Sequence, residues 1–235
     1  MGGGISAAFT SYFPTLVDSL ILIAPSGLLR ASHIHWTSRL IYGGLVPKTL
    51  VNHLVRRRLG GGSSATPMKS SNPEATPAKA VTGEVPDSEH PALSPDSHAP
   101  LFANRPSVSV ADAVSWQLTH HQGFLPAFIS SIQHAPISGQ HDRWRLIGQR
   151  MAEQRTHPLD SDLARHGLQG GRALLVLGKD DTIVVANEIA EDTRTVLGLD
   201  GVEVAVLEGG HDLPIVHSTK VAQTIMDFWH STDDR

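Results

Sequence analysis

Short, uninterrupted runs of apolar residues predict the buried strands of this chain. Residues 20–24 (Leu-Ile-Leu-Ile-Ala) are closed by a Pro-Ser-Gly turn, and residues 173–177 (Ala-Leu-Leu-Val-Leu) are closed by Gly178. Such a run is typical of a strand that is buried on both faces, as in a parallel sheet with helices on either side. Residues 202–207 predict a third strand near the end of the chain.

Helical spacing of apolar residues predicts the segments around these strands. The expected helices cover residues 5–13 (stopped by Pro14), short stretches within 31–58, positions 110–118, 124–132 and 144–151, and finally 187–197 and 218–229. The chain therefore ends as strand, helix, strand, helix, which predicts a parallel sheet and the α/β fold class.

Residues 60–107 have a different composition. This segment is rich in Gly, Ser, Thr, Pro and Ala, holds eight of the fifteen prolines and has one aromatic residue, Phe102. It cannot bury enough apolar area to offset the conformational entropy of ordering it. We therefore expect residues 60–107 to be a disordered insertion.

Composition excludes several classes of function. The chain has 235 residues, no cysteine, a net charge of −4 and 18% charged residues. Disulfides, thiolate zinc sites and iron-sulfur clusters are excluded, and no basic excess indicates nucleic acid as a partner. No apolar run approaches the roughly 20 residues of a membrane span, and the N-terminus does not read as a secretory signal. We expect a cytoplasmic protein, and the sequence does not define its oligomeric state.

Ionisable side chains follow the last two predicted strands. Asp181 comes shortly after residues 173–177, and His211 shortly after residues 202–207. The carboxyl ends of parallel strands meet at one edge of a sheet, where ligands of α/β proteins gather. We expect Asp181 and His211 to lie side by side there, within hydrogen-bond reach. The alternative is that Asp181 caps the following helix and His211 is an ordinary loop residue.

The end of the chain resembles that of the α/β-hydrolase fold superfamily. That family closes with a strand, a Gly-x-x-Asp turn bearing the triad acid, a helix, a strand, a Gly-His loop bearing the triad base, and a helix. Gly178 to Asp181 and Gly210-His211 match this pattern in type, order and spacing. The resemblance implies that Asp181 is the orienting acid and His211 the general base of a serine hydrolase, acting on a small-molecule ester, thioester or amide without a cofactor or metal.

The beginning of the chain is similar to the segment that follows the family's nucleophile elbow, where glycines, a small-residue helix, a proline and an apolar strand come in turn. The similarity covers roughly residues 1–30 and 170–231. It implies hydrolase-core segments at 1–30 and 170–235, separated by a helical cap at 31–169 that contains the segment 60–107. The expected fold is thus the C-terminal part of an α/β hydrolase.

In this alignment the nucleophilic serine would stand just before Met1, so the chain as given is expected to be inactive. Two explanations remain open: a fragment or shortened gene model of a longer enzyme, or a short product without catalysis. Two other functions also remain open, namely an interaction protein that uses the proline-rich segment as a tether, and an epoxide or haloalkane hydrolase with an aspartate at the elbow. An apolar sheet edge without its neighbours predicts poor solubility.

Other polar residues have simpler interpretations. Ser6 lies in a relaxed Gly-x-Ser-x-small pattern, but no buried strand precedes it, so we expect a helix residue that packs on the sheet. His33, His35, His120 and His121 lack the spacing of a metal site, and Arg56 to Arg58 are expected to be a solvated basic triplet.

Overall fold

The computed structural model describes residues 1–30, 32, 42–43, 46–60, 95–102, 104–156 and 167–233. A three-stranded parallel sheet forms its centre, in the order β1-β4-β5. The strand β4 pairs with β1 at three positions and with β5 at six. The predicted α/β class, with a parallel sheet flanked by helices, is confirmed. The strands are β1 (Ile21–Ile23), β4 (Ala173–Gly178) and β5 (Val202–Leu207).

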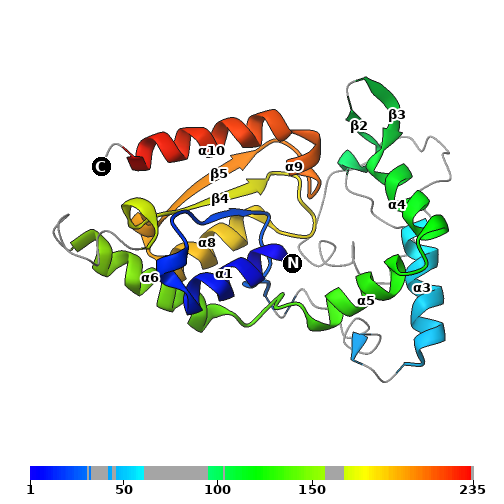
Figure 1. Ribbon diagram of the computed structural model, residues 1–235, viewed down its shortest axis with the longest axis horizontal. Helices are drawn as coiled ribbons and strands as arrows, with labels where there is room; N and C mark the ends of the chain where they lie inside the picture. Colours follow the sequence, from blue (N-terminus) through cyan, green and yellow to red (C-terminus); the bar gives the residue numbers. More distant parts are fainter. Residues whose placement is uncertain are drawn as a thin grey trace.

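Helices cover both faces of the sheet (Figure 1). All residues of β4 are buried, and because its side chains alternate, Leu175 packs on one side and Leu174 on the other. The first side is covered by α1 (Gly2–Tyr12), α6 (His141–Thr156) and α8 (Ala186–Leu197), and the second by α9 (Leu213–Val216) and α10 (Ser218–Asp233).

A second group of elements forms what we call the lobe, on the right of Figure 1. It consists of three helices that share a small apolar core around Val55, Leu118 and Ile129, and a hairpin that precedes the second of these helices. Its elements are β2 (Pro100–Phe102), β3 (Arg105–Ser109), α3 (Lys48–Gly60), α4 (Val110–His120) and α5 (Phe124–His134). Over the part of the chain that is described, no helix combines the length and apolar character that crossing a bilayer requires.

Local contacts explain how α4 begins and how closely α1 packs. Ser109 and Asp112 form a capping box at the start of α4, in which each side chain binds the other residue's backbone N–H. The same Ser109 hydroxyl holds the pKa of Asp112 below its ordinary value. At the start of α1, Gly4 is needed because a Cβ there would lie 2.4 Å from the carbonyl oxygen of Pro136. The helix can therefore pack closely on the segment that enters α6.

Two expectations from sequence need correction. Residues 61–94 lie outside the described part, but residues 95–102 and 104–107 of the predicted disordered insertion are ordered in η6 (Pro95–His98), β2 and β3. Long-range contacts of η6 with the loop after β5, described below, stabilise this end. In addition, α6 lies within the expected cap, yet its apolar face packs into the sheet core through Trp144, Ile147 and Met151.

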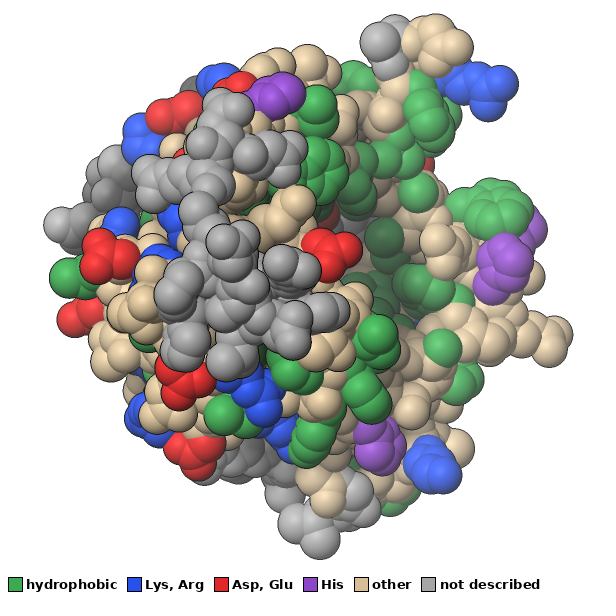
Figure 2. All heavy atoms as spheres, turned by 60° about the vertical axis from the view of Figure 1, so that its left-hand side comes forward, with side chains coloured by type: hydrophobic (Ala, Val, Ile, Leu, Met, Phe, Trp, Pro, Cys, Tyr) green, Lys and Arg blue, Asp and Glu red, His purple; other side chains and the backbone are tan. Residues whose placement is uncertain are grey.

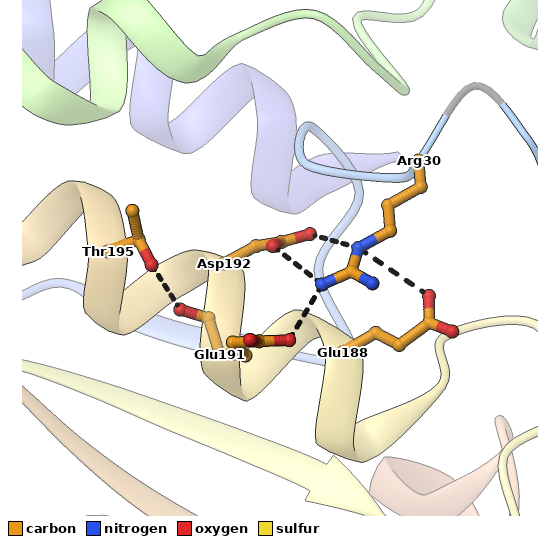
Figure 3. A network of polar contacts seen from close by, with 5 residues as sticks. All are labelled: Arg30, Glu188, Glu191, Asp192 and Thr195. Carbon is orange, nitrogen blue, oxygen red and sulfur yellow. Dashed lines mark hydrogen bonds and ion pairs between the residues drawn. The ribbon is translucent and has the colours of Figure 1, made fainter.

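The loop after β1 is tied to α8 by Arg30. The guanidinium group binds Asp192 through two nitrogens, both at 2.9 Å, and Glu191 at 2.8 Å, while Glu188 lies 3.8 Å away (Figure 3). Hydrogen bonds with Asp192 and then Glu191 raise the pKa of Arg30 further above its ordinary value. Its positive charge is thus permanent and links the loop after β1 to α8.

Candidate functional site

Asp181 and His211 meet at the carboxyl edge of the sheet. Nδ1 of His211 lies 2.9 Å from Oδ2 of Asp181. The two residues follow β4 and β5, which are paired in register up to Gly178 and Leu207. The juxtaposition that the spacing predicts is confirmed, and Asp181 does not act as the cap of α8, whose N-cap residue is Val185.

The turn after β4 forms because two glycine-rich segments approach each other closely. A Cβ at Gly178 would lie 2.6 Å from the carbonyl oxygen of Gly209, which is closer than a side chain allows. The backbone N–H of Lys179 donates to Leu207, and that of Asp180 donates to Gly209. These backbone hydrogen bonds fix the turn to the end of β5 without any side chain of the site.

The Asp181 side chain is enclosed, and both of its carboxylate oxygens make hydrogen bonds. Its side chain has no exposed surface. Oδ1 accepts the backbone N–H groups of Ile183 and Val184, at 2.8 and 2.9 Å, which leaves Oδ2 for the imidazole of His211. Three hydrogen bonds on its two oxygens hold the carboxylate in one rotamer and one orientation.

Nδ1 of His211 contacts Asp181, and the His211 side chain is partly open to solvent. Its side chain is 33% exposed. Because a carboxylate only accepts hydrogen bonds, the contact with Asp181 assigns the proton of the neutral ring to Nδ1. Nε2 then carries the lone pair on the far side of the ring. Chemically, an imidazole oriented in this way can accept a proton at Nε2.

The loop that carries His211 has a partner that the sequence did not reveal. Oδ2 of Asp96, in η6, accepts the backbone N–H of Gly210 in a short hydrogen bond. The neighbouring Ser97 hydroxyl donates to Oδ2 of Asp212 at 3.3 Å. Burial raises the pKa of Asp212 above its ordinary value of 3.8, against the smaller opposing effects of His211 and Ser97. No local pattern marks Asp96, which lies over a hundred positions away, in a segment predicted to be disordered.

The strand β1 brings the start of α1 to the same edge of the sheet. After β1, Ala24 adopts a φ of 41°, a left-handed conformation that costs a non-glycine residue about 1–2 kcal/mol. The hydroxyl of the buried Ser26 donates to the carbonyl oxygen of Met1 at 3.3 Å. The first residue of the chain therefore lies at the carboxyl end of β1, on the same sheet edge as Asp181 and His211.

The remaining residues of interest lie elsewhere. Ser6 is on α1 as predicted, but it is exposed, and the neighbouring Ala7 packs against the sheet instead. His120 and His121 contact the ring of Trp116 on the lobe, and Arg56 donates to the carbonyl oxygen of Leu118. His33 and His35 lie outside the described residues. Within the described ranges, no group of three potential ligands is arranged for a metal ion.

Comparison with known proteins does not assign a family: no protein-family model matches the chain, and no curated protein matches it either.

Proposed function

We propose that residues 1–235 form the acid/base part of a serine hydrolase of the α/β-hydrolase type. The observation that carries the proposal is the 2.9 Å contact between Nδ1 of His211 and the buried carboxylate of Asp181, at the ends of adjacent parallel strands. This is the arrangement of the general base and the orienting acid in a nucleophile-base-acid triad. The nucleophile in this proposal is a serine just before Met1, at the edge where α1 begins.

The proposed reaction is the hydrolysis of an ester, thioester or amide. The serine Oγ attacks the acyl carbon as its proton passes to Nε2 of His211. The same proton then goes to the leaving group as its bond to the acyl carbon breaks, which leaves the acyl group on the serine. Water attacks this acyl-enzyme by the same proton route, releases the carboxylic acid and restores the serine. Asp181 stabilises the imidazolium in both halves.

Reactivity toward a fluorophosphonate probe tests the proposal, because the probe labels a serine only when a base activates it. We expect no labelling of residues 1–235, and labelling of a form extended upstream through a Gly-x-Ser elbow. In the extended form, Asp181→Asn should slow labelling by about four orders of magnitude, because an amide at this position favours the wrong tautomer. The matched control for His211→Gln is His120→Gln, at an exposed position on the lobe. The His120 variant should be labelled at the original rate.

Labelling of the 235-residue form would place the nucleophile within the chain and overturn its proposed position. An extended form that stays unlabelled with His211 intact would overturn the serine mechanism. In that case, turnover of an epoxide or haloalkane would indicate an aspartate nucleophile, and inactivity toward all of these substrates would indicate a non-catalytic interaction protein.

A further inference from the structure

The lobe contacts the sheet at the loop that carries His211. The short helix η6 precedes β2, and β2 lies beside α9, directly after that loop (Figure 1). Asp96 accepts from Gly210 N–H, and Ser97 binds Asp212, so residues of η6 hold the positions on both sides of His211. The backbone N–H of Ala99 closes η6 by donating to Asp96. These contacts join the lobe to the loop through side chains on one short turn.

The hydrogen bond from the Gly210 N–H to Asp96 fixes the peptide group that joins Gly209 to Gly210, one residue before His211. His211 follows Gly210 directly, so rotation about the backbone bonds of Gly210 would turn the imidazole away from Asp181. Glycine itself resists such rotation less than other residues do. Packing leaves little room around the bond, since a Cβ at the preceding Gly209 would meet the ring of His217 at 2.7 Å and Oδ2 of Asp96 at 3.2 Å.

We propose that Asp96 is a positioning residue for His211, and that through η6 the lobe fixes the imidazole on Asp181. Asp181 holds the end of the side chain, and Asp96 holds the backbone from which the side chain starts. The proposal rests on the proposed function only where it treats His211 as a base. The positioning itself is a property of the 235-residue chain.

The charges around the loop require that charge and geometry be tested separately. Asp181, Asp96 and Asp212 all lie close to His211 or its backbone, and His217 packs against Gly209. Asp96→Asn removes the charge but keeps an oxygen that can accept from Gly210. Asp96→Ala removes both. The exposed Asp200→Asn, in the turn before β5, is a control that removes the same charge at a distant point.

The experiment uses nuclear magnetic resonance on the full 235-residue chain. Nitrogen shifts of the His211 ring report which nitrogen carries the proton, and hydrogen exchange reports the protection of the Gly210 amide. In Asp96→Ala we expect exchange at Gly210 to accelerate about tenfold or more, as expected for the loss of a hydrogen bond to a charged group. We also expect a mixture of ring tautomers in place of the Nδ1–H form.

Asp96→Asn should keep the Nδ1–H tautomer, and Asp200→Asn should change neither signal. Asp181→Ala should lose the Nδ1–H preference without exposing the Gly210 amide, which separates the two supports. If a urea titration shows that Asp96→Ala is not folded, the double variant Ser97→Ala with Asp96→Asn replaces it. Hydrogen exchange at Gly210 should then accelerate by a smaller factor. Unchanged exchange and an unchanged tautomer in the folded variant would overturn the positioning role, even if the fluorophosphonate experiment succeeds.

Discussion

The two outer strands of the sheet are built differently. The β5 side pairs with β4 at six positions, contains Glu203 in an ion pair with Arg172, and ends in the hydrogen-bonded loops of Asp181 and His211. The β1 side pairs at only three positions and has no charged residue in its strand. The Asp181–His211 pair therefore lies on the side of the sheet with the more complete support within the described residues.

The helix that precedes β1 shows the same contrast. Along α1 and just beyond it, large apolar side chains recur every fourth residue and are roughly half exposed, at Met1 (43%), Ile5 (57%), Phe9 (47%) and Phe13 (49%). On the face in Figure 2, hydrophobic side chains gather around a hollow, while charged side chains concentrate toward the left. An exposed apolar stripe along one helix is typical of a surface that another element or a partner covers.

The largest expected effect compares one core position on each strand. Leu175 of β4 has no exposed surface, so Leu175→Ala should lower the free energy of unfolding by about 2–5 kcal/mol. Ile23 of β1 is only partly buried, so Ile23→Ala should lower it by less than half as much. Urea denaturation followed by circular dichroism measures both. Equal losses would show that the β1 side is as well packed as the centre.

A smaller effect is expected where the β1 side is fastened to α8. Arg30→Met keeps much of the stem but removes the contacts with Asp192, Glu191 and Glu188. Because the Arg30 side chain is 38% exposed, solvent screens the network, and the loss should be about 1 kcal/mol. The difference between wild type and variant should shrink at high salt. A difference that does not depend on salt would indicate lost packing in place of lost charge pairs.

The elements of the sheet were predictable because their signals are local. The runs at 20–24, 173–177 and 202–207 form β1, β4 and β5, and α8 and α10 begin within one residue of their predicted starts. The meeting of Asp181 and His211 followed from the parallel order and the turn residues alone. Their catalytic role stays a prediction.

What the sequence did not show depends on which partner an element finds. The apolar face of α6 is the same whether it packs in a lobe or on a sheet, and only the fold selects the sheet. The order of η6 depends on Asp96 meeting Gly210, a contact between distant segments that no pattern of composition encodes. Composition alone therefore placed the end of the disordered segment too late.

The exposed stripe on α1 should affect solubility more than stability. Replacing Ile5 and Phe9 by lysine should change the free energy of unfolding by about 0.5–1.5 kcal/mol at most, since the main loss is the contact of Phe9 with Phe13 at 5.0 Å. The double variant should remain in solution at concentrations where the original chain scatters light. As a control, Leu199→Lys introduces a charge at an exposed leucine far along the chain and should not raise solubility as much. If the original chain is already monomeric at high concentration, the exposed apolar residues of α1 do not cause self-association, and the expectation is wrong.

The smallest expected effect lies on the well-supported β5 side and depends on pH. Burial raises the pKa of Asp212 in the folded chain above its ordinary value of 3.8. Between these two values the folded state binds more protons than the unfolded state, so this residue's contribution to stability is present at low pH and is lost as the pH rises through the folded pKa. At neutral pH, Asp212→Asn should therefore raise the free energy of unfolding, by about half a kcal/mol or less because the group is only half-buried. An asparagine can still accept from Ser97.

The gain in the free energy of unfolding should vanish below the ordinary pKa, and Asp200→Asn should show no such pH-dependent gain. If Asp212→Asn instead destabilises the chain at neutral pH, the ionised carboxylate supports the loop of His211, and the β5 side relies on charge more than on burial.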